Sequence, residues 1–317
     1  MKRASSSPAT RSWACLRRIW LPALVLCLTT LPALAGPVEI TDDLGRQVRL
    51  AAPAERIVAL YGAFNEMLDG MALTERITAR TQADELPASI LDRPVIGTHM
   101  RPNVEMIVAL KPDLVLQMGG RAEAAAPLRD LERFGLTTAF FEARSFAELF
   151  SVLQRLGVLC GEPGRAATLE QSLRSRLEAV ARVVDGDGHS TVLFEIRYPN
   201  LLAAGRGSMI DDVIRAAGGK NAVPLDDKLA RLSEEEVFRL DPDAYVLQRG
   251  PMNRNPVPPG ERPNFKGLRA VRQGRVLVVN ELLFSRPGPR NVEAVETLAR
   301  FLHPGRFQDG VKGSAKP

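Results

Sequence analysis

Arginine and aromatic side chains gather in the segments that follow predicted strands, and most of the chemistry in this sequence lies there. Arginine binds carboxylates through two parallel hydrogen bonds and stacks on planar rings. A single loop arginine is usually only a solvated side chain, but the set predicts a cleft that binds a ligand. The candidate ligand-binding residues are Tyr61, His99, Met100, Arg101, Arg144, Arg197, Tyr198, Arg249, Phe284 and Arg286.

The sequence lacks the common catalytic motifs. It has no Gly-x-Ser-x-Gly, no His-Glu-x-x-His and no P-loop. His99, His189 and His303 are too far apart for a zinc site of ordinary spacing. We therefore expect no enzyme activity, no cofactor and no resident metal. A periplasmic hydrolase that uses Ser208 or Ser285 is the alternative from another class, although no base is placed beside either serine.

Strands and helices alternate through the first half of the sequence, after a predicted β-hairpin at 38–50. This rhythm is typical of a parallel sheet covered by helices. The strands are expected at 56–60, 77–80, 94–97, 113–117 and 137–141, and the helices at 65–73, 103–111, 122–135 and 146–160.

A long amphipathic helix is predicted at 163–184, and the alternation resumes after it. About 22 residues at 1.5 Å each span roughly 33 Å, which is enough to run along two lobes. The predicted fold class is therefore α/β, with two Rossmann-like lobes joined by a single long helix and a ligand cleft between the lobes. Later strands are expected at 191–196, 244–248 and 275–280, and helices at 208–219, 234–240, 265–271 and 291–303.

The first 35 residues resemble a secretory signal peptide. Five basic residues and no acidic one precede Gly36, an apolar run covers 19–34, and Ala33-Leu34-Ala35 offers a cleavage site. A membrane anchor is the alternative, but the run is short and two prolines interrupt it. We expect cleavage after Ala35 and a periplasmic protein. Sec or Tat export, and lipid attachment at Cys27, stay open.

Charge and cysteine content narrow the function further. The whole chain carries a formal charge of +5, and removal of five leader charges leaves about zero, so no nucleic-acid partner is predicted. Only Cys160 remains after cleavage, so no internal disulfide can form. The predicted domains are a signal peptide at 1–35, an N-terminal lobe at 36–160, the inter-lobe helix at 161–186, a C-terminal lobe at 187–304 and a flexible tail at 305–317.

One phrase occurs twice. LKPDLVLQMGG covers 110–120 and LDPDAYVLQRG covers 240–250. Both describe a helix that ends before Pro-Asp and a buried strand. An internal repeat and a chance likeness of two common junctions are equally good explanations of the phrase alone. Glu105 and Glu235 fall at the same offset, which favours the repeat.

The segments RIVAL, RPNVEMIVALKPDLVL, AAGGKNAV, LSEEEVFRLDPDAYVL and SRPGPRNVEAVETLARFLHP resemble the periplasmic substrate-binding proteins of ABC importers for ferric siderophores, haem and vitamin B12. The resemblance covers about 38–304. It implies a monomer with two lobes, a rigid inter-lobe helix, a ligand cleft and modest closure. It also implies that Glu105 and Glu235 dock onto arginines of an ABC permease in the inner membrane.

The resemblance leaves three ligands open. A ferric siderophore ranks first, because anionic siderophores need the arginines and tyrosines that the loops supply. Haem ranks second, with His99, Tyr61 or Tyr198 as an axial ligand of the right type. A corrinoid ranks third, because the mature chain lacks tryptophan. A bare metal ion ranks below these, since one histidine without an acidic cluster holds a metal poorly.

Overall fold

A four-stranded parallel sheet forms the N-terminal lobe. The computed structural model describes residues 36–119, 122–185 and 190–307, so the predicted signal peptide lies outside the described residues. The strand order is β4-β3-β7-β8, and every neighbouring pair is parallel. The strands are β3 Ile57–Ala59, β4 Ile77–Ala79, β7 Leu114–Met118 and β8 Thr138–Phe141.

Four α-helices accompany this sheet, at the positions that the sequence predicts. They are α1 Ala63–Gly70, α2 Val104–Leu110, α3 Ala126–Arg133 and α4 Phe146–Leu159. Short 3-10 turns lie at Thr74–Arg76, Ala88–Ile90 and Ala122–Ala125.

The strand predicted at 94–97 is wrong in its position. Val95 makes only a single bridge to Arg80, and the pairing that forms is a small antiparallel ladder of β5 Gly97–Thr98 with β6 Arg101–Pro102. Pro94 has no N–H to donate to a ladder. Gly97 has a φ of 92°, a conformation that glycine adopts easily and that turns the chain here.

The C-terminal lobe has a mixed sheet. Its strand order is β12-β10-β9-β13-β14, with the short strand β11 also paired to β9. The central pairs β9–β13 and β13–β14 are parallel. The strands are β9 Thr191–Arg197, β10 Leu202–Ala204, β11 Lys220–Asn221, β12 Leu229–Arg231, β13 Ala244–Arg249 and β14 Val276–Asn280.

The sequence misses the antiparallel strands β10 and β12, which are three residues long and too short for a periodic pattern. The helix predicted at 265–271 shrinks to α8 Arg269–Arg272, because Gly267 interrupts it and the buried Phe265 and Leu268 anchor turns instead. The other helices are α6 Met209–Ala216, α7 Glu234–Leu240, α9 Glu281–Phe284 and α10 Asn291–Leu302, with a 3-10 turn at Pro259–Glu261.

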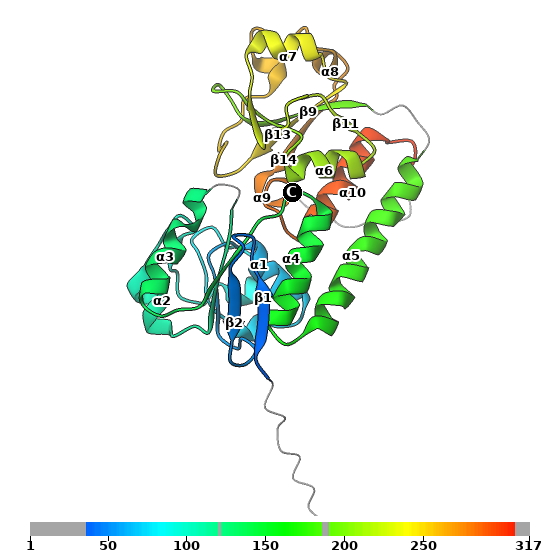
Figure 1. Cartoon of the computed structure of the whole chain (residues 1–317). Coiled ribbons are helices and arrows are strands. Elements are labelled where there is room, and N and C mark those ends of the chain that lie inside the picture. The colour runs from blue at the N-terminus through cyan, green and yellow to red at the C-terminus, as the bar shows by residue number, and fades with distance from the viewer. Residues whose placement is uncertain (1–35, 120–121, 186–189, 308–317) are drawn as a thin grey trace, which may run out of the picture. The chain divides into compact units, whose positions relative to one another are not determined.

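The long helix α5 has the predicted bounds, Pro163–Val184, with proline in its first turn. It packs against α4 of the first lobe and against α6 and α10 of the second (Figure 1). Arg176 on α5 donates to Glu296 on α10 at 2.8 Å. One apolar core runs from Phe141 of the first lobe to Phe194 of the second. This core contains residues on both sides of the boundaries predicted at 160/161 and 186/187, and those boundaries stay predictions.

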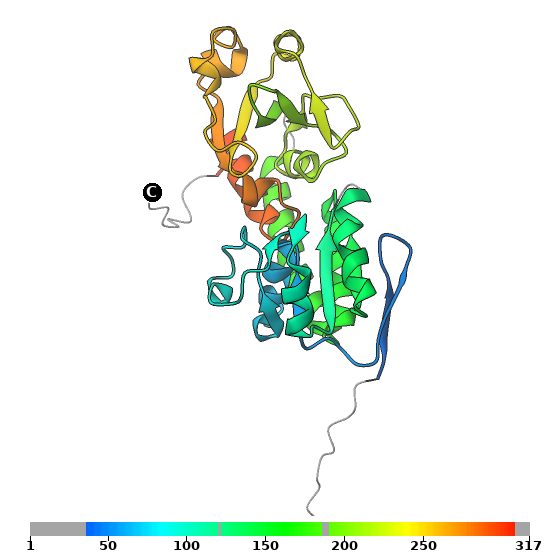
Figure 2. The same cartoon turned by 90° about the vertical axis from the view of Figure 1, so that its left-hand side faces the viewer.

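The predicted hairpin is confirmed. β1 Val38–Thr41 pairs antiparallel with β2 Gln47–Leu50, and the two strands form a ribbon of their own (Figure 2). Asp42 holds the turn, because its carboxylate accepts the N–H groups of Leu44 at 3.0 Å and Arg46 at 2.9 Å. It also accepts the N–H of Phe140 at 3.2 Å and so ties the ribbon to β8.

The repeated phrase marks the same structural step in both lobes. α2 and α7 begin at 104 and 234, and β7 and β13 begin at 114 and 244, so the offset is 130 each time. Each strand is paired on both sides with parallel strands. The residues that end the helices, Lys111 and Asp241, both adopt the left-handed conformation, with φ of 49° and 34°.

The chemistry of the two steps matches as well. The side chains of Asn103 and Ser233 cap α2 and α7 by accepting an N–H three residues later. Asp113 accepts the N–H groups of Glu55 and Arg56 at 2.9 and 2.8 Å, just before β3. Asp243 accepts the N–H of Thr191 at 2.8 Å, at the start of β9. The internal repeat is therefore structural as well as a likeness of sequence.

The end of the described chain is held more firmly than the sequence suggests. Arg306 donates to the carbonyl oxygens of Val183 at 2.9 Å and Asp185 at 2.8 Å, and Phe307 packs on the core. The flexible tail predicted at 305–317 stays a prediction, because only its first residues, 305–307, are described and 308–317 lies outside the described residues. Among the described helices, none is long and apolar enough to cross a membrane.

Candidate functional site

Residues of both lobes line one cavity, which has a volume of about 550 Å³. Most of its lining follows the carboxyl ends of strands, where open α/β sheets bind ligands. The first lobe contributes Leu60, Tyr61, Gly62, Thr81, Ala83, Asp84, His99, Met100, Met118, Gly119, Ala124 and Ala143. The second contributes Ile196, Ser208, Met209, Ile210, Lys228, Leu229, Pro251, Met252, Glu281, Leu282, Ser285, Arg286 and Pro287.

The walls of the cavity are mainly apolar. Four of the lining residues are methionines, two from each lobe: Met100, Met118, Met209 and Met252. Met100 and Met252 are 43% and 42% exposed, whereas Met118 and Met209 are buried. Unbranched thioether side chains adapt to irregular apolar surfaces. A broad apolar ligand surface can therefore be accommodated from both lobes.

A charged pair crosses from one lobe to the other inside this cavity. Arg286 follows α9 of the second lobe, and its Nη1 lies 3.7 Å from Asp84 Oδ1 and 3.9 Å from Glu66 Oε1 of the first. The Asp84 side chain is fully buried. Burial raises the pKa of Asp84, although hydrogen bonds from Thr81 and the charge of Arg286 oppose this. Burial also raises the pKa of Glu66 to about 7.

Gly62 leaves the space that this pair needs. A Cβ at this position would collide with Asp84 Oδ1 and Arg286 Nη1. Any larger residue would force the two charged groups aside, so glycine here is a requirement of the site and not of the turn.

An imidazole and a phenol also line the cavity. The rings of Tyr61 and His99 lie edge to face, with centroids 6.0 Å apart. Burial raises the pKa of Tyr61 to about 12, so its hydroxyl is neutral at pH 7. Burial and the nearby Arg286 lower the pKa of His99, so its imidazole is also neutral at pH 7. A neutral imidazole offers a lone pair to a metal.

The second lobe adds a buried carboxylate. Glu281 accepts the N–H of Met252 at 2.7 Å, and burial raises its pKa. Ser285 donates its hydroxyl to the side-chain oxygen of Gln248. Among the described residues, Gln248 Nε2 has no hydrogen-bond partner.

Four of the predicted ligand-binding residues line the cavity: Tyr61, His99, Met100 and Arg286. Their role in binding stays a prediction. The other six do not line it: Arg101, Arg144, Arg197, Tyr198, Arg249 and Phe284.

The six residues outside the cavity have other surroundings. Phe284 is buried in the core, 5.8 Å from the Phe194 ring. Tyr198 stacks under the guanidinium of Arg262 at 3.8 Å and donates to Glu234. Arg101 and Arg249 are exposed on β6 and at the end of β13, and Arg197 ends β9.

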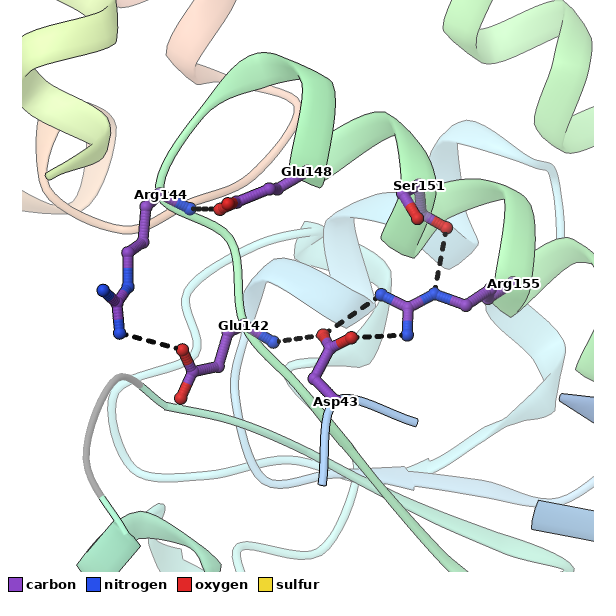
Figure 3. Close-up of a pocket in the computed structure, with 6 residues that line it drawn as sticks. All are labelled: Asp43, Glu142, Arg144, Glu148, Ser151 and Arg155. Atoms are coloured by element: carbon purple, nitrogen blue, oxygen red, sulfur yellow. Dashed lines mark hydrogen bonds and ion pairs between the residues drawn. The ribbon is translucent and has the colours of Figure 1, made fainter. Parts of the chain in front are cut away.

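Arg144 lies in a separate surface pocket of about 410 Å³ on the first lobe (Figure 3). The charges of this pocket are already paired with one another. Arg144 donates a hydrogen bond to Glu142 at 3.0 Å, and Arg155 donates two hydrogen bonds of 2.6 and 3.1 Å to Asp43. These hydrogen bonds tie the hairpin turn to α4. Arg144 does not line the cavity of the two lobes, although its neighbour Ala143 does.

Sequence reasoning missed Asp84, Glu66 and Glu281. Asp84 comes after the predicted strand at 77–80, so the rule that selects loops at strand ends could have found it. Glu281 directly follows the strand β14, and the same rule applies to it. Glu66 lies within a helix pattern and gave no signal. Among the described residues, no group of three or more His, Cys, Asp or Glu side chains is arranged to hold a metal ion.

The predicted docking residues occupy equivalent places. Glu105 and Glu235 are exposed in the first turns of α2 and α7. Within the described part of the chain, neither carboxylate has a hydrogen bond or an ion pair. Their neighbours are engaged: Glu234 accepts from Tyr198 and Asn264, and Glu236 completes the cap of α7. The structure therefore separates Glu235 from the two adjacent glutamates.

Known proteins are similar to this chain in sequence. The chain is 28% identical over 281 residues to the uncharacterized ABC transporter substrate-binding lipoprotein YvrC of Bacillus subtilis, covering 86% of this chain and 88% of that protein. It is 21% identical over 247 residues to the vitamin B12-binding protein of Vibrio vulnificus, covering 78% and 89%.

A solved structure has a similar fold. The periplasmic heme binding protein of Pseudomonas aeruginosa superposes with a TM-score of 0.70 at 25% identity, covering 80% of this chain and 94% of that one. Residues 57–281, well over half of the chain, match the family described as periplasmic binding protein. This chain therefore belongs to the periplasmic binding protein family.

Proposed function

We propose that this protein captures a metal tetrapyrrole, haem or a corrinoid, outside the cytoplasm and delivers it to an ABC importer. The observation that carries the proposal is the cavity itself. It combines apolar walls from both lobes with a neutral imidazole from His99. Its volume of about 550 Å³ lies within the ordinary range for small-molecule sites.

His99 is the candidate axial ligand. Its side chain lines the cavity, and its backbone oxygen accepts a hydrogen bond from Gln117 at 2.8 Å, which fixes the loop that presents it. Haem iron is held by His or Tyr in many proteins, and Tyr61 lies beside His99. The relatives named for vitamin B12 and heme support the same class of ligand.

The ferric siderophore, ranked first from the sequence, now has less support. That ranking depended on a set of arginines and tyrosines, and only Arg286 and Tyr61 of the set line the cavity. Arg286 is already faced by Asp84 and Glu66. A negative charge of the ligand at Arg286 would therefore lie beside both acids.

The test is a titration of the purified mature protein with hemin, aquacobalamin and a ferric siderophore, followed by visible absorption. We expect a tetrapyrrole to bind, and His99→Ala to change the Soret band of any hemin complex. Arg101→Ala is the matched control, because Arg101 lies in the same loop but outside the cavity. Binding of the siderophore alone would overturn the proposal.

Docking and export belong to the same proposal. The equivalent, exposed and unpaired positions of Glu105 and Glu235 in the described structure support contact with two permease subunits. Cleavage after Ala35 stays a prediction, and N-terminal sequencing of the exported protein checks it.

A further inference from the structure

Asp84 and Arg286 form a charged pair that is incomplete. Asp84 is fully buried and lines the cavity, yet its Oδ1 has no hydrogen-bond partner among the described residues. Arg286 Nη1 is 3.7 Å from this oxygen, which is too long for a hydrogen bond. Buried polar atoms are almost always hydrogen-bonded, so an acceptor without a donor in a ligand cavity calls for an explanation.

Other contacts hold both side chains in place. Asp84 Oδ2 accepts the N–H of Thr81 at 2.8 Å and the side-chain amide of Asn65 at 3.3 Å. Arg286 Nη2 donates to the carbonyl oxygen of Ala83 at 3.3 Å. Because these bonds use Oδ2 and Nη2, the atoms Oδ1 and Nη1 remain to face a third group. Gly62 lets both atoms pack this close to the backbone, because a Cβ at this position would collide with them.

The third group must both donate and accept. A hydrogen-bond donor satisfies Asp84 Oδ1, and an acceptor satisfies Arg286 Nη1. A primary carboxamide has both on one planar group, whereas a carboxylate offers only acceptors and places a negative charge beside Asp84. Glu66 Oε1 lies 3.9 Å from Nη1, so a ligand carboxylate at this position would lie beside a second acid as well.

We propose that the Asp84–Arg286 pair binds a carboxamide of the ligand, so that the cavity selects an amide-bearing tetrapyrrole over a carboxylate-bearing one. This inference rests on the proposed function. Corrinoids carry carboxamides around the ring and haem carries carboxylates, so the pair favours a corrinoid. Sites built to hydrogen-bond a particular group reject analogues that leave their buried polar atoms unpaired.

The test compares two probes with the same ring, dicyanocobyrinic acid heptaamide and dicyanocobyrinic acid, by calorimetric titration. We expect the wild-type protein to bind the heptaamide about 10- to 100-fold more tightly, as for hydrogen bonds to a charged group. Asp84→Asn can donate to a carboxylate, so this variant should lose most of the preference. Glu178→Gln removes a carboxylate that is exposed on α5 and lies outside the cavity, and should keep the preference.

The outcomes are distinct. Equal affinity of the wild-type protein for the two probes overturns the inference and needs no variant, so misfolding cannot hide the answer. A preference that persists in a folded Asp84→Asn protein also overturns it. If neither corrinoid probe nor hemin binds while a ferric siderophore does, the proposed function itself fails.

Discussion

The two lobes share one structural step and differ in the loops beyond it. In each lobe, a capped seven-residue helix ends in a left-handed residue, a Pro-Asp pair comes next, and a central parallel strand begins. The loops after the strands diverge. The first lobe brings the rings of Tyr61 and His99 and the carboxyl group of Asp84 to the cavity, whereas the second lobe brings the two cationic residues of the lining, Lys228 and Arg286.

The shared step builds the scaffold of each lobe, and the loops beyond it line the ligand cavity. The shared step uses backbone conformation and local hydrogen bonds, and these constraints are the same in both lobes. The loops carry no such constraint, so each lobe can supply a different chemistry to one ligand. Arg286 joins the two halves, because it belongs to the second lobe and contacts the acids of the first.

The largest effect is expected from the docking residues. Glu105→Arg combined with Glu235→Arg sets like charges against the permease arginines that the resemblance implies, which costs several kcal/mol. Uptake in cells that carry the importer should be lost, while ligand affinity of the purified protein is unchanged. Asp92→Arg with Glu178→Arg, two exposed positions outside the cavity, is the control. If the lobes dock equivalently, each single variant reduces uptake to a similar extent.

Wild-type uptake by the double variant would refute the docking role. Loss of ligand affinity in that variant would refute it as well, since the two residues would then act on the ligand site.

The next effect concerns the acids of the first lobe. Glu66 has a pKa raised from 4.5 to about 7 in the folded protein, so the folded state binds this proton more strongly than the unfolded state. Its contribution is present below pH 4.5 and is lost as the pH rises through about 7. We expect a loss on the order of 3 kcal/mol across this window. Arg286, Arg290, Asp84 and Glu293 are the charged groups that act on it.

Glu66→Gln should remove this loss, and urea unfolding at pH 5 and pH 8 measures it. Glu178→Gln, an exposed acid on α5 that does not act on Glu66, should leave the slope as in the wild type. If the free energy of unfolding of the Glu66→Gln protein falls with pH as in the wild type, Glu66 has an ordinary pKa in the folded protein. The pKa values of the acids of the first lobe are then no more strongly shifted than those of the second.

The smallest effect tests the shared step itself. Asp113→Ala and Asp243→Ala each remove a carboxylate that holds the start of a neighbouring strand, which should cost about 1–2 kcal/mol in the free energy of unfolding. Asp243 also pairs with Arg269 at 2.6 Å, so its replacement should cost slightly more. Urea unfolding measures both, with the exposed Asp92→Ala as the control. A neutral effect of one and a large effect of the other would break the equivalence.

Local signals predicted the helices well. The bounds of α5 follow from Pro163 at its start and from an apolar stripe that Glu170 interrupts. Those of α2 and α7 agree with Asn103 and Ser233 before them and with the Pro-Asp pairs after them. Propensity and capping act within a few residues of sequence, so these features can be read without the fold. The short antiparallel strands β10 and β12 had no such local signal.

The sequence by itself determined the α/β class, the long inter-lobe helix, the repeat at an offset of 130 and the loops in which a site had to be sought. Only the tertiary structure decided which loop residues reach the cavity. Asp84 and Arg286 are about two hundred residues apart and meet only when the lobes are assembled. Tyr198 and Arg286 are equally good loop candidates in the sequence. Arg262 and Phe265 pack against Tyr198 within the second lobe, and it does not line the cavity. The reason is physical: pairing of buried charges and rings depends on long-range packing, and no local pattern of residues records it.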